Sequence, residues 1–257
     1  MALSKALVSL VLMLAAAALL SSIAYGVIGW KQVTGGIRGL GEFILYHTYN
    51  IYDKTWWAGS PEAVTSIIWD YRGIDTVFET IVLYAAITGC LVLWSGLGEY
   101  WRKKGGRLTL VVRTATKILF AIILITSFNI ALHGYITPGG GFAGGATFAV
   151  APLLLLAAYG IDYLRRRGYR ISRSKLIRSA ALLLLALIVF IPFWMNGYLL
   201  ENQAKPHAGF PGYPVYLGPL YIGGSLIYLN VFEFLVVAME FIIVFIVFTI
   251  IWVGEKK

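Results

Sequence analysis

The stretch that decides the fold is LNVFEFLVVAMEFIIVFIVFTIIWV, which covers residues 229–253 near the end of the chain. It is apolar except for Asn230, Glu233, Glu240 and Thr249. About 20 apolar residues in a helix are enough to cross the hydrocarbon core of a bilayer. Backbone in lipid must satisfy its own hydrogen bonds, so a run of this length is predicted to be a membrane-spanning helix.

Five further apolar runs of comparable length precede this stretch. They are Ala6–Gly29, Val77–Leu97, Val111–Leu132, Gly144–Tyr163 and Ala180–Leu200. The chain has 257 residues, of which 59% are hydrophobic and 13% are charged. Soluble domains carry about 25% charged residues, and disordered chains are poor in aliphatic and aromatic residues. We therefore expect an all-α integral membrane protein with six transmembrane helices, a multi-pass protein of the cell membrane.

The first apolar run has a second interpretation. Lys5, the apolar residues 6–20 and the small residues 22–24 are also typical of a signal peptide. We count this run as the first of the six helices, which makes the number of spans even.

Lysine and arginine residues fall in short clusters between the apolar runs. With six helices these clusters lie on one side of the membrane, which the positive-inside rule identifies as cytoplasmic. Both termini are then cytoplasmic, and residues 30–76, 133–142 and 201–228 lie on the outer side. The net charge of +9 therefore needs no nucleic-acid partner, since no basic face with interleaved aromatic residues exists. The clusters comprise Arg102, Lys103, Lys104 and Arg107; then Arg165, Arg166, Arg167, Arg170, Arg173, Lys175 and Arg178; and finally Lys256 and Lys257.

The sequence divides into two regions. Residues 1–105 hold two helices and a long outer segment with a short helical patch at Pro61–Asp70, and residues 106–257 hold four helices. The basic stretch Arg102–Arg107 is the expected seam between them. Cys90 is the single cysteine, so a disulfide within the chain and a metal site built from thiolates are excluded.

A charged motif leads into the second helix. Asp75 and Glu79 are four residues apart and share one helix face, and Arg72 is within reach of either carboxylate. Asp75 could cap the start of the helix. Alternatively, the motif could relay protons or cations, because Glu79 stands where the chain enters lipid.

A glycine-rich hairpin precedes the fourth helix. Consecutive glycines allow tight turns with positive φ, and glycines in the first turn of a helix allow close approach to a neighbour. A rigid hairpin between packed helices is the favoured interpretation, and an ion-binding turn is the alternative. No Gly-Lys-Ser follows, so it is not a phosphate-binding loop. Its residues are Pro138, Gly139, Gly140, Gly141, Phe142, Gly144 and Gly145.

The last helix carries a polar stripe. Asn230, Glu233 and Glu240 follow spacings of three and seven, so they lie on one face. A carboxylate such as Glu240 in mid-membrane marks a polar pathway or a buried partner. Lys117 in the third helix is the obvious candidate for a basic counterpart, although the favoured interpretation is that its side chain extends toward the head groups. The histidines lack metal-ligand spacing, so we expect this chain to bind no metal and no cofactor, with sodium ions or protons only as transported ions.

The hairpin and the last helix resemble a known family. Residues 137–145, TPGGGFAGG, resemble the Pro-Gly-Gly-Gly-Phe-x-Gly-Gly signature of the B subunit of Mrp-type multisubunit sodium/proton antiporters. Residues 226–230, followed by Leu235 and Val237, resemble the last helix of that family, which usually carries a lysine where this chain has Val236. The resemblance covers the region 106–257.

The first region has a resemblance of its own. Residues 70–79, DYRGIDTVFE, are similar to the Asp-Phe-Arg-Gly-x-Asp-Thr-x-x-Glu signature at the end of the large antiporter A subunit. An A-subunit tail fused to a B subunit is typical of archaeal membrane-bound hydrogenase and sulfane reductase complexes. The resemblance therefore implies partners of two kinds, namely other antiporter subunits and complex-I-like membrane subunits.

These observations indicate a membrane subunit without redox groups in an ion-translocating oxidoreductase complex, and no enzyme on its own. The candidates for the ion pathway are Asp75, Glu79, Arg72, Glu233, Glu240 and Lys117. Of these, only Arg72, Asp75 and Glu79 lie in a stretch that resembles a family signature. The alternatives are a purely architectural bridging subunit of the same assembly and a subunit of a stand-alone Mrp antiporter. An autonomous transporter is disfavoured, because no inverted repeat or pair of broken helices is visible.

Overall fold

A computed structural model describes residues 13–22, 38–94, 108–203, 205 and 212–254 of the chain. It divides into two compact units, Met1–Glu42 and Phe43–Lys257. The described part of the first expected span, Met13–Ser22, is an apolar helix. The rest of that span and the expected seam Arg102–Arg107 lie outside the described residues.

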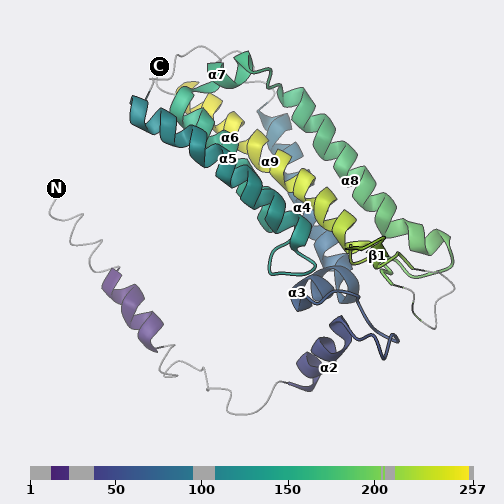
Figure 1. Cartoon of the computed structure of the whole chain (residues 1–257). Coiled ribbons are helices and arrows are strands. Elements are labelled where there is room, and N and C mark those ends of the chain that lie inside the picture. The colour runs from purple at the N-terminus through teal and green to yellow at the C-terminus, as the bar shows by residue number, and fades with distance from the viewer. Residues whose placement is uncertain (1–12, 23–37, 95–107, 204, 206–211, 255–257) are drawn as a thin grey trace. The chain divides into compact units, whose positions relative to one another are not determined.

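Five helices are long and apolar enough to cross a membrane within the described ranges. They are α4 (Gly73–Leu93), α5 (Leu110–His133), α6 (Gly141–Tyr159), α8 (Ile171–Trp194) and α9 (Leu226–Gly254), shown in Figure 1. Each matches one of the six expected spans, which confirms an all-α membrane protein with about five candidate spans.

The helices begin earlier than the apolar runs that predicted them. α4 begins at Gly73, four residues before Val77, and α8 begins at Ile171, nine residues before Ala180. In α4 the added turn is polar and is fixed by the Thr76 hydroxyl, which donates to the Ile68 carbonyl at 2.7 Å. Apolar length therefore predicts the part of a helix that meets lipid, whereas polar contacts extend it beyond.

α9 is the central helix of the second unit. It packs against α4, α5, α6 and α8 (Figure 1). In an apolar stretch of 18 residues in α9, 61% of the residues are buried. In the corresponding stretches of α4 and α5 the shares are 11% and 17%. The polar stripe of α9 is therefore enclosed by this chain, while α4 and α5 offer apolar faces to lipid or to other subunits.

Short elements close one end of the helix bundle. α3 (Ala63–Ser66) continues into the π-helix η1 (Ile67–Tyr71), as the patch Pro61–Asp70 predicted, and a hairpin forms from β1 (Tyr216–Leu217) and β2 (Leu220–Tyr221). The Ser60 hydroxyl donates to the Tyr135 carbonyl, and the Asn202 amide donates to the Ala58 carbonyl at 2.7 Å. Within the second unit, the described parts of the three segments expected on the outer side thus lie together at one end, which we call the outer cap (residues 43–72, 133–140, 198–203, 205 and 212–225). A further short helix, α2 (Gly39–Thr48), includes the boundary between the two units.

The opposite end of the bundle carries the basic loop. Here α7 (Ile161–Arg166) joins α6 to α8, far from α3 and β1 in Figure 1. One apolar cluster lies near each end. The cluster near the outer cap contains Trp69, Tyr135, Leu185, Val189, Leu200, Leu226 and Leu229, and the other contains Ala149, Leu156, Leu164, Ile242 and Ile246.

Candidate ion-pathway site

Glu233 is held at the beginning of α6. Its side chain is buried, and one carboxylate oxygen accepts a hydrogen bond from the Phe142 backbone N–H at 3.1 Å. The amino end of a helix carries partial positive charge, which favours a carboxylate at this place. A Cβ atom at Gly141 would lie 2.5 Å from that oxygen and 2.7 Å from the Glu233 Cβ, so glycine is required for the approach.

The rest of the glycine hairpin lets α6 fit between α5 and α9. A Cβ on Gly144 would lie 2.8 Å from the Ala131 Cβ of α5. A Cβ on Gly145 would lie 2.8 Å from the Phe234 carbonyl oxygen of α9. Gly140 has a φ of 131°, and its N–H donates to the Ile130 carbonyl at 3.1 Å. The hairpin is thus a packing device that also places an N–H group on a buried carboxylate.

Asn230 lies one helical turn before Glu233 and is also buried. Its side-chain oxygen accepts a hydrogen bond from the Trp69 indole N–H at 2.8 Å. Its amide nitrogen has no hydrogen-bond partner among the residues that the structure describes. A buried amide donor of this kind can serve an anion or a carbonyl group that enters the site.

The charged motif at the start of α4 separates into two parts. Arg72 and Asp75 form an ion pair whose side chains are 73% and 61% exposed. No side-chain hydrogen bond caps α4, so the expected capping role of Asp75 is not found. Glu79 is also exposed, but it lies near enough to Glu233 to act on it electrostatically. Only Glu79 therefore connects this motif with the polar stripe of α9.

Glu240 has a different partner from the one that the sequence suggested. Its carboxylate is fully buried, and both of its oxygens accept hydrogen bonds from Nη1 of Arg178 at 2.7 Å. Lys117 is exposed and has no ion pair within the described part of the chain. The prediction of Lys117 as the counterpart of Glu240 is therefore wrong, because α8 and not α5 presents a cation at this depth.

Arg178 joins three helices. Its Nη2 atom donates to the Thr88 hydroxyl of α4 at 3.0 Å, and its guanidinium lies 4.4 Å from the centre of the Tyr84 ring. The sequence placed Arg178 in the cytoplasmic cluster. Arg178 lies two residues before the apolar run that starts at Ala180. This position was the feature of the sequence that could have indicated a side chain inside the bundle.

A second buried ion pair lies in the outer cap. The Lys205 ammonium donates to both oxygens of Asp70, at 2.9 and 3.1 Å. Burial raises the pKa of Asp70, while Lys205 acts in the opposite direction. Asp70 begins the motif that resembles the A-subunit tail, but its partner is 135 residues away in the chain and no local pattern indicates it.

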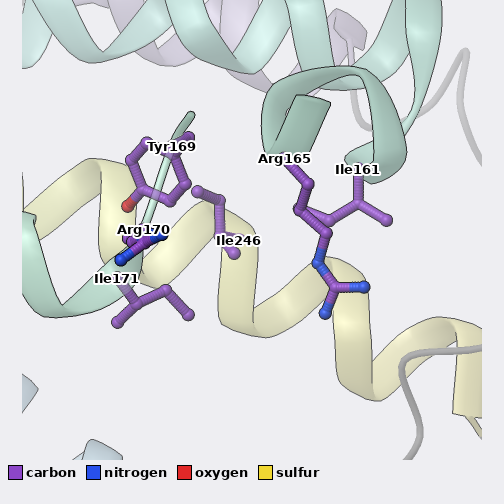
Figure 2. Close-up of a pocket in the computed structure, with 6 residues that line it drawn as sticks. All are labelled: Ile161, Arg165, Tyr169, Arg170, Ile171 and Ile246. Carbon is purple, nitrogen blue, oxygen red and sulfur yellow. The ribbon is translucent and has the colours of Figure 1, made fainter. Parts of the chain in front are cut away.

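A basic pocket of about 400 Å³ lies at the end of the bundle that carries α7. Figure 2 shows Ile161 and Arg165 of α7 on one side and Tyr169, Arg170 and Ile171 on the other, with Ile246 of α9 between them. None of the candidate pathway residues lines this pocket.

No group of three or more His, Cys, Asp or Glu residues that could hold a metal ion occurs in the described ranges. His47 Nδ1 lies 2.8 Å from the Phe43 carbonyl oxygen, and His133 Nδ1 lies 3.3 Å from the Asn129 carbonyl oxygen. The Nδ1 atom of each of these two histidines thus lies beside a backbone carbonyl group of its own helix. His207 lies outside the described residues.

Two chains of solved structures illustrate what this chain is similar to. A chain of the membrane-bound sulfane sulfur reductase, an archaeal respiratory membrane complex, matches with a TM-score of 0.64 and 26% identity, over 92% of this chain and 96% of that one. A chain of the Mrp complex from Dietzia sp. DQ12-45-1b matches with a TM-score of 0.63 over 91% of this chain and 25% of that one. Its identity of 19% shows the fold alone.

Sequence comparison gives the family. The B subunit of the Na⁺/H⁺ antiporter of Bacillus subtilis is 45% identical over 56 residues, which are 22% of this chain and 39% of that protein. The chain spans less than half of the length of the first curated relatives that it matches. The family model described as a domain related to the MnhB subunit of Na⁺/H⁺ antiporters matches residues 111–243. These residues include the glycine hairpin, Arg178, Glu233 and Glu240, and the chain belongs to this family of multi-pass membrane proteins.

Proposed function

We propose that the chain is a membrane subunit without redox groups in an Mrp-type sodium/proton antiport module, within a respiratory complex that couples electron transfer to ion translocation. This proposal rests mainly on the structural match, which covers 92% of this chain and 96% of a chain of the sulfane sulfur reductase. In this proposal six helices span the membrane and both termini are cytoplasmic. Residues 1–105 correspond to an A-subunit tail and residues 106–257 to a B subunit.

The exposed apolar faces of α4 and α5 support assembly with other subunits. The partners that we propose are further antiporter subunits and complex-I-like membrane subunits. Glu79 stands on the exposed side of α4, so a partner helix at this face would bring its polar groups to Glu79. A carboxylate that faced lipid without such a partner would be costly.

The proposed pathway uses Glu79 and Glu233 as a coupled pair. Glu79 takes up a proton or a sodium ion at the exposed face of α4. Its loss of negative charge then favours the ionised form of Glu233, because the two carboxylates repel each other. The Phe142 N–H stabilises Glu233 in that form at 3.1 Å. Asp75, which is paired with Arg72, attracts cations to the mouth of the pathway together with Glu79, and Lys117 extends toward the head groups.

The pair Glu240–Arg178 stands deeper in this scheme. Two charge-assisted hydrogen bonds at 2.7 Å hold the Glu240 carboxylate on Arg178. Proton transfer to Glu240 requires Arg178 to shift toward Thr88, to which it already donates. Glu240 is therefore proposed as an electrostatic stabiliser of the inner half of the pathway.

A purely architectural role is the second candidate. It is favoured by the glycine hairpin and by Arg178, which join α4, α6, α8 and α9 through packing and buried hydrogen bonds. A subunit of a stand-alone Mrp antiporter is the third candidate, and it differs only in the subunits that assemble with this chain.

One experiment separates the first two candidates. Glu79→Gln and Glu233→Gln are introduced into the complex purified through a tag on this chain, and ion transport is measured per assembled complex. The pathway role predicts that transport falls at least about 10-fold, in the range of other lost proton-transfer groups. Glu42→Gln, which removes an exposed carboxylate in α2, is the matched control and keeps full transport. Full transport by both test variants would leave only the architectural role.

The subunits that co-purify with the tagged chain test the third candidate. Redox subunits with iron–sulfur clusters or other electron carriers support the respiratory complex. Antiporter subunits alone would show a stand-alone antiporter instead.

A further inference from the structure

A cavity of about 450 Å³ opens in the outer cap, beside the buried ion pair of Asp70 and Lys205. Glu201 and the aromatic residues Tyr71 and Tyr198 also line it. The Asp70 side chain is 1% exposed and that of Lys205 is 11% exposed, so both charges are largely withdrawn from water. The cavity is therefore a lined cleft with buried charges and not an accidental surface hollow.

Glu201 adds a second carboxylate to this cleft. It is 4% exposed, and one of its oxygens accepts a hydrogen bond from the Tyr198 backbone N–H at 3.0 Å. Its other oxygen, Oε1, is buried and has no hydrogen-bond partner in the part of the chain that the structure describes. Glu201 also acts electrostatically on Asp70. Two buried carboxylates thus line one cleft, and the ammonium group of Lys205 is paired with Asp70.

The charges in this cleft do not balance. With both carboxylates ionised, Asp70 and Glu201 carry two negative charges and Lys205 carries one positive charge. The nearby Arg72 does not compensate, because it is exposed and paired with Asp75. In the sequence of the adjacent segment 206–211, His207 is the single titratable residue. An unbalanced buried charge is costly, so one additional unit of positive charge would stabilise the cleft.

We propose that the cleft binds one monovalent cation of the sodium class between Asp70 and Glu201, and that the Lys205 ammonium stays paired with Asp70 and weakens this binding by charge repulsion. Hard cations bind to carboxylate and carbonyl oxygens, and Glu201 Oε1 is an oxygen that lacks a donor among the described residues. A divalent cation would overcompensate the charge while Lys205 stays in place. This site goes beyond the proposed function, because it lies in the outer cap and does not include Glu79 or Glu233.

A proton can supply the same unit of charge. Burial raises the pKa of Asp70, and burial together with the charge of Asp70 raises the pKa of Tyr71. Tyr71 therefore stays neutral. The other titratable side chains that line the cleft or follow it in the sequence are Tyr198, Glu201, Lys205 and His207. Protons and the cation compete for the two carboxylates, so cation binding strengthens as the pH rises.

Carbodiimide labelling tests whether a cation binds. The full chain in detergent is treated at one pH in sodium chloride or in N-methylglucamine chloride of equal ionic strength, and labelled carboxyl groups are identified by mass spectrometry. Sodium is expected to reduce labelling at Asp70 and Glu201 several-fold. Asp75, paired with Arg72 at the surface, is the internal control and is labelled equally in both salts. Equal labelling of Asp70 and Glu201 in both salts would overturn the proposal.

Two variants test the assignment of the groups. Lys205→Gln removes the repelling positive charge, so the sodium concentration that gives half-protection of Glu201 should fall at least about 10-fold. Asp70→Asn should abolish the protection of Glu201, and His207→Gln should leave it unchanged. Loss of protection in Lys205→Gln would overturn this assignment, because Lys205 would then be needed to build the site. Should that variant fail to fold, the labelling of the wild-type chain still decides whether a cation binds.

Salt substitution tests the class of cation. Protection by potassium or lithium, each with its own half-protecting concentration, supports a monovalent site. Protection by calcium chloride alone would show an acidic cluster that binds divalent ions, and it would overturn the proposal.

Discussion

Replacement of Arg178 by leucine removes the cation that faces Glu240 in the centre of the bundle. The lost contacts are two hydrogen bonds at 2.7 Å to Glu240 and one at 3.0 Å to Thr88. Glu240 is fully buried and would keep no cation among its described contacts. Removal of one partner from a buried ion pair costs about 3–5 kcal/mol, so Arg178→Leu should lower the free energy of unfolding by that amount.

A double-mutant cycle isolates the interaction. Glu240→Leu alone leaves the arginine unpaired and should cost a similar amount. The double variant Arg178→Leu/Glu240→Leu removes both buried charges, and it should recover most of the loss because apolar replacement of a whole pair is close to neutral. The expected coupling energy is therefore at least about 2 kcal/mol. Unfolding of the full chain in detergent, followed by tryptophan fluorescence, measures all four proteins.

Lys117→Leu is the matched control for this cycle. Lys117 is exposed, so its replacement should change the free energy of unfolding by less than about 0.5 kcal/mol. Additive costs in the double variant, with no coupling, would refute the reasoning. A larger loss in the free energy of unfolding for Lys117→Leu than for Arg178→Leu would indicate that Lys117 is the partner of Glu240.

Four further predictions concern other parts of the molecule. Gly145→Val should cost at least about 2 kcal/mol, measured by thermal unfolding, because its side chain would meet the backbone of α9. Gly140→Val should reduce the amount of assembled complex, measured by size-exclusion chromatography, because valine resists a φ of 131°; normal assembly with altered ion selectivity would instead place the hairpin in the pathway. Trp69→Phe leaves the Asn230 oxygen without its donor and should cost about 1–3 kcal/mol, whereas no change would show that water replaces the indole. Burial raises the pKa of Asp70 above its ordinary 3.8, so the wild type should lose stability as the pH rises from 3.8 through the pKa of the folded state. Asp70→Asn should lack this part of the pH dependence, and parallel pH profiles of the two proteins in sodium-free buffer would contradict the prediction.

The pair Glu79 and Glu233 shows how a sequence motif acquires a partner. Glu79 stands in a motif of α4 that the sequence marks clearly, and Glu233 stands in α9, far along the chain. In the structure Glu79 acts electrostatically on Glu233, and the Phe142 N–H donates a hydrogen bond to Glu233. Asp75 stands on the same face of α4 but forms its ion pair with Arg72 at the surface.

The sequence by itself determined the class of protein and the approximate place of each described span. Apolar length decides where a chain crosses lipid, and this property is local, so residues 229–253 predicted α9 without knowledge of any neighbour. The glycine signature was equally local, and it identified where helices pack closely. The sequence predicted the first residue of each helix less accurately, because polar contacts such as that of Thr76 with Ile68 extend helices beyond the apolar run.

Only the tertiary structure decided which charged groups meet. Glu240 and Arg178 are 62 residues apart, and Asp70 and Lys205 are 135 residues apart. Depth along a helix suggested Lys117 for Glu240, but depth says nothing of which face a helix turns inward. That rotation is set by packing, in which α6 fits between α5 and α9 through glycines and α8 turns Arg178 toward α9. An ion pair depends on the rotation of both helices, and no segment of sequence contains that information alone.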